Sequence, residues 1–364
     1  MMALTLFFMS GGKIPSDPWK LVTLVVTFIF FNSMFFLMIH TGKTDRYRAT
    51  VFITYSFLFV LSFITHMIEA RGSMTLSLEK VLLCEVPFCH LVIPMTLIPA
   101  AFTNTIIFPG SIIGGFASIA SMFIIWIGAS LSLGRGWCSW GCFYGGLDDA
   151  FSRIRKKSFI KTIDRRWTYL PWAVLLAVVL TAAAFLSPTY CSWLCPYKAV
   201  TEFSEVTSFK ILVQTIIFVS LFIALVIVLP ILTKRRIQCA LFCPFGAMQS
   251  LTNKINAFDI RIDADKCVKC KRCVNACPTL SMTEESSKEG HPLMSCMKCG
   301  TCVDVCPRNA IQFGIRGTPA SGSGELKRIL FLYTAFLFLA IFSSDDIQNG
   351  LLRIIKLITT GSMI

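Results

Sequence analysis

The sequence carries little charge for its length. Of its 364 residues, 15% are Asp, Glu, Lys or Arg, whereas 55% are hydrophobic. The mean hydropathy is +0.69. Because soluble globular domains have about 25% charged residues, this composition argues against an ordinary soluble protein and is typical of a polytopic membrane protein.

The sequence also lacks the motifs of common catalytic sites. It contains no Gly-rich phosphate loop, no dinucleotide-binding fingerprint, no nucleophile elbow and no His-Glu-x-x-His. Histidine, the usual general acid or base, occurs only four times. We therefore expect a subunit of an oxidoreductase complex rather than a stand-alone enzyme, with the substrate chemistry in a partner.

Acidic residues are few, 20 against 34 basic ones, which gives a formal charge of +14. The basic residues lie in short loops beside apolar runs, at 43–48, 151–166 and 234–236. This is the pattern of loops on the cytoplasmic side of a membrane, so we do not expect nucleic-acid binding. The segment 188–208, which has one lysine, is expected on the opposite side.

Long apolar runs predict the transmembrane helices, because about 20 apolar residues cross a bilayer as a helix. The runs are 21–39, 50–68, 91–108, 111–133, 168–187, 208–232 and a shorter one at 329–343. They predict an all-α polytopic membrane protein with about six or seven hydrophobic helices. The alternation of sides favours a re-entrant segment somewhere in residues 91–133.

Cysteine is abundant, with 16 residues. Half of them form two runs of the pattern Cys-x2-Cys-x2-Cys-x3-Cys-Pro, in which three cysteines hold one [4Fe–4S] cluster and the fourth holds the other. One predicted ligand set is Cys267, Cys270, Cys273 and Cys306, and the other is Cys296, Cys299, Cys302 and Cys277. Structural zinc also uses Cys-x2-Cys pairs, but it does not explain the complete pattern occurring twice.

These runs define the one polar domain of the chain. We predict a transmembrane domain over 1–254, an inserted α+β bacterial 2[4Fe–4S] ferredoxin domain over 255–316, a linker over 317–327, and a C-terminal hydrophobic helix and tail over 328–364. Cluster-bound cysteines must be reduced thiols, which favours a cytoplasmic location for the ferredoxin domain.

The remaining cysteines come in four pairs near the ends of apolar runs: Cys84/Cys89, Cys138/Cys142, Cys191/Cys195 and Cys239/Cys243. In three pairs the spacing is i and i+4, which would place both sulfurs on one helix face. Pairing of cysteines on the same side of the membrane predicts two clusters. The inner membrane-edge cluster would be held by Cys138, Cys142, Cys239 and Cys243. The outer cluster would be held by Cys84, Cys89, Cys191 and Cys195. Simple packing is the alternative for any one pair, and disulfides or a thiol–disulfide relay are further alternatives for the outer pairs.

Together these features resemble the NapH/MauN-type membrane polyferredoxins, whose relatives include NosR and CcoG. The resemblance covers 111–315 and rests on Gly134–Cys142, Cys239–Ala247 and the ferredoxin cysteines. It implies a multi-pass protein of a prokaryotic inner membrane that passes electrons between a cytoplasmic donor or the quinone pool and a partner oxidoreductase. A maturation or regulatory factor for a metalloenzyme is the alternative. Phe143 departs from the family pattern, which has proline there.

Histidines and charges near the run ends are weaker candidates. A quinone site would use His66, Glu69 and His90. His40 and His66 stand where haem b ligands could stand, but histidines at helix ends are more often interfacial, so we do not expect haem b. Basic residues beside the cluster loops could dock an acidic electron donor: Lys269, Lys271, Arg272, Lys298 and Arg308.

Overall fold

Four helices in the described part of the chain are long and apolar enough to cross a membrane. The structure is a computed structural model that describes residues 2–72, 90–95, 97–98, 119–160, 163–201, 208–318 and 324–361. The four spans are α2 (Pro18–Thr41), Arg165–Phe185 with α9 (Leu170–Phe185), Phe209–Thr233 with α11 (Phe209–Leu221), η5 (Phe222–Val228) and α12 (Leu229–Thr233), and α17 (Gly324–Thr360). Their number is that of a multi-pass membrane protein.

Local sequence explains where these helices begin and end. Asp17 caps α2 by accepting from the amide of Trp19, Pro18 occupies the first turn, and Gly42 ends the helix with φ 75°. Ser208 caps α11 in the same way. Leu176 on α9 and Ile216 on α11 are 62% and 56% exposed. Such outward apolar side chains suit contact with lipid.

Three of the predicted runs lie in helices whose bounds differ from those of the runs. The run 50–68 lies in α3 (Thr44–Gly72), whose first turns are charged. The run 111–133 is described only as α6 (Ile119–Ser132). The short run 329–343 is part of α17, which has 37 residues and begins at Gly324, inside the predicted linker. The run 91–108 lies mostly outside the described residues, so the total of six or seven helices stays a prediction.

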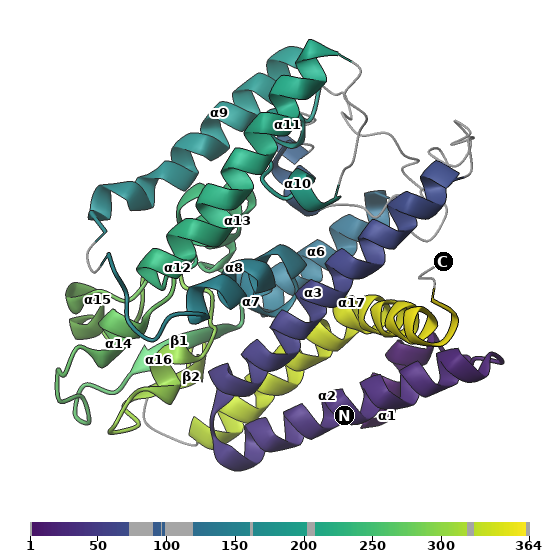
Figure 1. The fold of residues 1–364 in the computed structure, drawn as a ribbon. Helices are drawn as coiled ribbons and strands as arrows, with labels where there is room; N and C mark the ends of the chain where they lie inside the picture. The colour runs from purple at the N-terminus through teal and green to yellow at the C-terminus, as the bar shows by residue number, and fades with distance from the viewer. Residues whose placement is uncertain are drawn as a thin grey trace.

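Helices α1 (Met2–Ser10), α2, α3 and α17 pack together around aromatic side chains (Figure 1). The ring of Phe336 on α17 lies 5.6 Å from Phe31 and 5.0 Å from Phe35, both on α2. Gly350 of α17 lies directly against Leu58 of α3. These contacts bury the inner face of α17 and leave its other face for lipid.

A small ferredoxin-type region follows the third span. Strand β1 (Phe258–Ile262) pairs antiparallel with β2 (Ile311–Ile315), with Ile260 opposite Phe313. Between the strands lie α14 (Arg272–Ala276), α15 (Glu284–Lys288) and α16 (Thr301–Asp304). Phe313 stacks on Phe331 of α17 with ring centroids 4.3 Å apart. The sheet therefore packs directly against α17, a helix long enough to cross a membrane, and is not joined to it by a linker alone.

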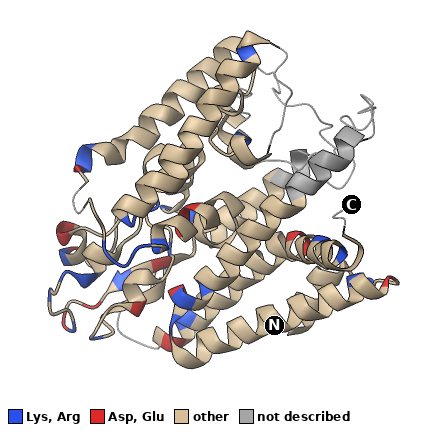
Figure 2. Cartoon of the chain, viewed as in Figure 1, with Lys and Arg blue, Asp and Glu red and all other residues tan. Residues whose placement is uncertain are grey.

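The ferredoxin-type region lies at one end of the long helices, near the end of α12 and the beginnings of α3 and α17 (Figure 1). The amide of Arg236, just after α12, donates to the carbonyl of Pro278 at 2.8 Å. The basic loops predicted to share a side with the ferredoxin domain are found at this end. Figure 2 shows charge gathered there, whereas α9 carries no charged residue and α11 carries only Lys210, at its beginning.

Asp304 joins this region to the membrane helices. Its carboxylate accepts from the amides of Thr44 at 2.9 Å and Asp45 at 2.8 Å, at the first turn of α3. The first amides of a helix have no partner within the helix, and the positive end of the helix dipole favours a carboxylate there. One residue of α16 thus caps a helix some 260 positions earlier in the chain.

Replacing Asp304 with alanine should therefore loosen the start of α3. Loss of a cap costs about 0.5–2 kcal/mol, so amide hydrogen exchange at Thr44 and Asp45 should accelerate about 2- to 30-fold. Asp304→Asn is the control, because asparagine also caps helices and should retain most of the protection. Equal exchange in wild type and Asp304→Ala would contradict this role.

Candidate metal centres

A buried cavity in the ferredoxin-type region is lined by one complete predicted ligand set, Cys277, Cys296, Cys299 and Cys302. Three of these cysteines come from the second run and Cys277 from the first. Pro278 follows Cys277, whose backbone is extended (φ −64°, ψ 113°), so the chain turns toward the other run. The donors are four thiols around a space, which fits a cubane cluster.

The other predicted set, Cys267, Cys270, Cys273 and Cys306, lies nearer the surface. Cys273 is close enough to Cys267 and Cys270 to interact with them electrostatically, and Cys270 is exposed. Lys269 and Lys271 on either side of Cys270 have positive φ of 54° and 57°. Lys298 and Gly300 flank Cys299 in the same conformation, with φ 51° and 90°. The two runs therefore repeat one tight loop.

Lys298 does not lie on a docking surface. It is 3% exposed, and its Nζ donates to the carbonyl of Leu133 at 2.9 Å and to Oδ1 of Asn253 at 2.5 Å. Burial lowers the pKa of Lys298 to about 8. Lys298 is therefore too buried to dock an acidic donor, contrary to the expectation from the sequence. The other basic residues beside the cluster loops are exposed: Lys269, Lys271, Arg272 and Arg308.

The three described pairs of the hydrophobic part share one local structure. The first cysteine of each is the second residue of a helical turn: α7 (Trp137–Trp140), η4 (Tyr190–Leu194) and η6 (Gln238–Phe242). The second cysteine is extended, with ψ of 107°, 108° and 117° at Cys142, Cys195 and Cys243. A new helix follows each: α8 (Phe143–Arg153), α10 (Lys198–Thr201) and α13 (Pro244–Thr252).

This geometry corrects the expectation that each pair shares one helix face. The second cysteine has left the helical turn, because the proline after Cys195 or Cys243 disfavours helical backbone at the residue before it. Cys142 adopts the same conformation before Phe143. The missing proline at that position therefore does not change the turn.

The pairs Cys138/Cys142 and Cys239/Cys243 lie together. Cys239 interacts electrostatically with Cys138 and Cys142, and Cys243 with Cys138. Two arginines bridge them reciprocally: Nη2 of Arg135 donates to the carbonyl of Cys239 at 2.8 Å, and Nη2 of Arg236 donates to the carbonyl of Cys138 at 2.7 Å. This juxtaposition is the one that the predicted inner cluster requires.

The ferredoxin-type region packs directly on these two pairs. Met297, between Cys296 and Cys299, forms a buried cluster with Cys138 and Cys239. The indole Nε1 of Trp140 donates to the carbonyl of Lys298 at 3.1 Å. The loop that holds one ferredoxin ligand set therefore contacts the first cysteine of both membrane-edge pairs.

Arg48 of α3 ties the same two loops together. It is fully buried, and it donates to the carbonyls of Cys299 and Ser139, each at 3.1 Å. Its charge is balanced by Asp45 at 2.7 Å and Asp149 at 2.9 Å. Buried charges need such partners, since an unpaired one is costly.

The pair Cys191/Cys195 packs into the same apolar cluster as residues of the other two described pairs. Cys195 belongs to the same buried apolar cluster as Cys142 and Cys243. Nε2 of Gln238 donates to the hydroxyl of Tyr190 at 3.2 Å, and Tyr197 stacks on Tyr144 at 4.0 Å. The segment after α9 thus packs against the helices that carry the other two described pairs.

The partners predicted for that pair, Cys84 and Cys89, lie outside the described residues, and the outer ligand set stays a prediction.

His90 is described: its Nε2 lies 3.0 Å from the sulfur of Cys142, and its ring lies 4.9 Å from Phe245. The side chains of His66 and Glu69 lie outside the described part of α3. His40 is exposed at the end of α2 and stacks on Phe36 at 5.7 Å.

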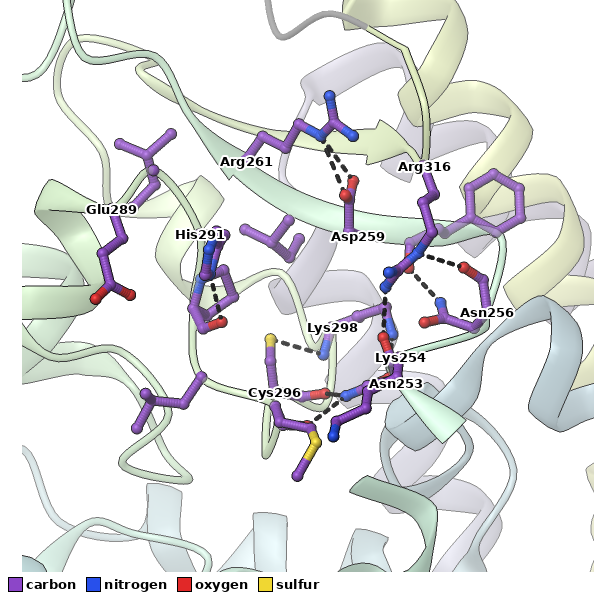
Figure 3. A pocket seen from close by; sticks show the side chains of 17 residues that line it. Asn253, Lys254, Asn256, Asp259, Arg261, Glu289, His291, Cys296, Lys298 and Arg316 are labelled. Carbon is purple, nitrogen blue, oxygen red and sulfur yellow. Dashed lines mark hydrogen bonds and ion pairs between the residues drawn. The ribbon is translucent and has the colours of Figure 1, made fainter. Parts of the chain in front are cut away.

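A cavity of about 580 Å³ opens beside Cys296, between β1 and the loop 289–296 (Figure 3). Arg316 lines it and donates through Nε to the carbonyl of Asn256 at 3.1 Å. Arg261, also in the lining, is paired with Asp259 at 3.1 Å.

Within the described residues, no three His, Cys, Asp or Glu side chains converge closely enough to hold a single metal ion.

Comparison with protein families identifies iron–sulfur domains over the same residues. Residues 259–307 match the 4Fe-4S dicluster domain. Residues 115–161, 168–213 and 215–262 each match the 4Fe-4S binding domain, and each stretch contains one Cys-x3-Cys pair. Residues 115–262 therefore contain three copies of this domain, a repeat that the cysteine spacing alone did not reveal. The chain binds [4Fe–4S] clusters.

Curated relatives are distant. The chain is 27% identical over 177 residues to "Putative electron transport protein YccM" of Escherichia coli (strain K12), an alignment that covers 45% of this chain and 46% of that protein. Two uncharacterized proteins of Methanocaldococcus jannaschii are 28% identical over 183 residues and 26% over 171, covering 71% and 59% of their lengths and 47% and 44% of this chain. The chain thus aligns with about half of YccM. No solved structure matches it.

The close packing around the bridging arginines predicts that Gly145 tolerates no side chain. A Cβ at this position would overlap Nη2 of Arg236 and the carbonyl of Cys138. Overpacking of this kind costs about 1–3 kcal/mol, so Gly145→Ala should lower the thermal unfolding midpoint of the purified protein. Gly128→Ala is the matched control, because no atom lies within 4 Å of its Cβ position. Equal midpoints for the two variants would contradict this packing.

Proposed function

We propose that this protein is a membrane electron carrier in which the ferredoxin-type region and the membrane-edge cysteines form one path for single electrons. The observation that carries this proposal is the buried contact of Met297 with Cys138 and Cys239. It joins a ferredoxin ligand loop to the two pairs without an intervening subunit. When bound, each cluster accepts and releases one electron.

The ligand assignment follows the predicted sets. Cys267, Cys270, Cys273 and Cys306 would hold the cluster nearest the surface, since Cys270 is exposed. The set that lines the small buried cavity, Cys277, Cys296, Cys299 and Cys302, would hold the second cluster. Cys138, Cys142, Cys239 and Cys243 would hold a third at the membrane edge, supported by the reciprocal arginine contacts between the two pairs and by the buried cluster that Cys138 and Cys239 form with Met297. Cys191 and Cys195, with Cys84 and Cys89, would hold a fourth.

The exposed end of this path is the natural entry or exit for a soluble partner. Lys269, Lys271 and Arg272 surround Cys270 and favour an acidic surface. The basic loops at this end of the helices support a cytoplasmic location in a prokaryotic inner membrane. The resemblance to NapH/MauN-type proteins and the similarity to a protein named for electron transport support a role beside a partner oxidoreductase, with a cytoplasmic donor or quinone.

A thiol–disulfide relay is less consistent with the pair Cys191/Cys195. Exchange between the two sulfurs of a relay requires both to be accessible, and Cys195 is 4% exposed although Cys191 is half-buried. No observation favours a maturation role over direct conduction.

Counting clusters tests the proposal. Anaerobically purified protein should contain clearly more than the about eight irons of two cubanes, with matching sulfide. Cys138→Ser and Cys239→Ser should each remove the same EPR signal, because both thiols belong to one ligand set. Cys270→Ser, as the comparison, should remove a different signal.

Two outcomes would refute the proposal. One is about eight irons per chain in wild type, which would confine the clusters to the ferredoxin-type region. The other is the independent loss of two signals in Cys138→Ser and Cys239→Ser, which would separate the pairs.

A further inference from the structure

The first and third repeats carry matching residues around their cysteines that the second repeat lacks. Arg135 and Arg236 each stand three positions before the first cysteine, and Gly145 and Gly246 each stand three positions after the second. In the second repeat these positions are Pro188 and Lys198. The first and third repeats therefore share a feature that the second repeat does not have.

The matching residues also make matching contacts. Besides the carbonyl of the opposite repeat's first cysteine, each arginine donates through Nη1 to a serine hydroxyl, Arg135 to Ser250 at 2.9 Å and Arg236 to Ser139 at 2.8 Å. A Cβ at Gly246 would lie 3.2 Å from Nη2 of Arg135 and 3.1 Å from the carbonyl of Cys239. Gly145 has the same two kinds of neighbour, Arg236 and the carbonyl of Cys138. The arginine, first-cysteine carbonyl and glycine thus make reciprocal contacts in the first and third repeats, although the two serines stand at different offsets from the cysteines.

Both arginines are buried and incompletely satisfied. Arg135 is 2% exposed and Arg236 is not exposed at all. In the part of the chain that the structure describes, the Nε–H of each is buried without a hydrogen-bond partner. Nη2 of Arg236 also lies 3.5 Å from the sulfur of Cys239. Two buried cations with an unused donor each, beside four thiols, suit an anionic group between them.

We infer that the first and third repeats form a single pseudo-twofold cage for one [4Fe–4S] cluster, in which Arg135 and Arg236 each position the opposite repeat's ligand turn and offset the charge of the bound cluster. This inference rests on the proposed membrane-edge cluster and deepens it. The second repeat, with Pro188 and Lys198, takes no part in the cage. The arginines are positioning residues and do not ligate iron.

The physical consequence concerns reduction. A cubane with four thiolates is an anion that gains a further negative charge when it accepts an electron, and nearby positive charge and hydrogen bonds to sulfur raise its potential. A charge in a buried site acts more strongly than at a surface because screening is weak. Removing either arginine charge should therefore lower the potential of this one cluster and of no other.

Redox titration of the full-length protein, followed by EPR, tests the inference. Arg135→Gln and Arg236→Gln should shift the same signal to lower potential by at least about tenfold in its reduction equilibrium, which is about 59 mV for one electron. Arg135→Lys and Arg236→Lys retain the charge and should stay nearer wild type. Arg165→Gln is the control, because Arg165 is an exposed arginine paired with Glu285 at the surface and should shift no signal.

The outcomes separate this inference from the proposed function. Loss of one and the same signal in both Gln variants, with the signal kept in the Lys variants, also supports the cage. Effects on two different signals, or an unchanged potential in either Gln variant, would overturn it. A wild-type protein with only two clusters would instead overturn the proposed function itself.

Discussion

Three buried arginines hold the cysteine loops of this protein against one another, and the proposed electron path depends on them. Arg48 joins Cys299 to Ser139, while Arg135 and Arg236 join the first and third repeats. Each donates to main-chain carbonyls, so it fixes the backbone of a ligand loop rather than a single side chain. A guanidinium suits this role because its rigid fork of donors can bind several acceptors at once.

Burying these charges requires compensation, and the three sites obtain it differently. Arg48 has Asp45 and Asp149 within 2.9 Å. Arg236 has Asp148 and Asp149 close enough to act on its charge. For Arg135 no carboxylate partner is found among the described residues, and its side chain contacts a carbonyl, a hydroxyl and the thiol of Cys138. Since an uncompensated buried charge is strongly destabilising, we propose that a bound membrane-edge cluster completes the electrostatics around Arg135. Folding and cluster binding are then linked, as in other metal sites whose ligands are brought together by the fold.

Much of this arrangement could be predicted from the sequence. The spacing of the ferredoxin cysteines gave the ligand set that the structure places around one cavity, because three ligands on one tight loop leave few alternatives. Hydropathy located the apolar spans, since a helix must be apolar to cross lipid. Charge in the loops predicted which helix ends lie near the ferredoxin-type region.

The rest depended on tertiary structure. Arg48 and Arg236 were interpreted as loop charges that set topology, yet both are fully buried. The packing of Cys195 into one apolar cluster with Cys142 and Cys243 has no signature in loop charge. The relation between the repeats could have been recognised from the sequence. Arginine and glycine stand at the same offsets from the Cys-x3-Cys pairs of the first and third repeats, and at neither offset in the second. Comparing the pairs with one another, rather than each with a known pattern, would have found it.

The central claim is that the cavity cluster and the membrane-edge cluster are neighbours on one path, and their magnetic interaction tests it most directly. In protein poised so that the ferredoxin clusters are reduced, reduction of the membrane-edge cluster should broaden the EPR signal of the cavity cluster and speed its relaxation. The effect should vanish in Cys138→Ser. A cavity-cluster signal that is indifferent to the redox state of the rest of the protein would contradict the account.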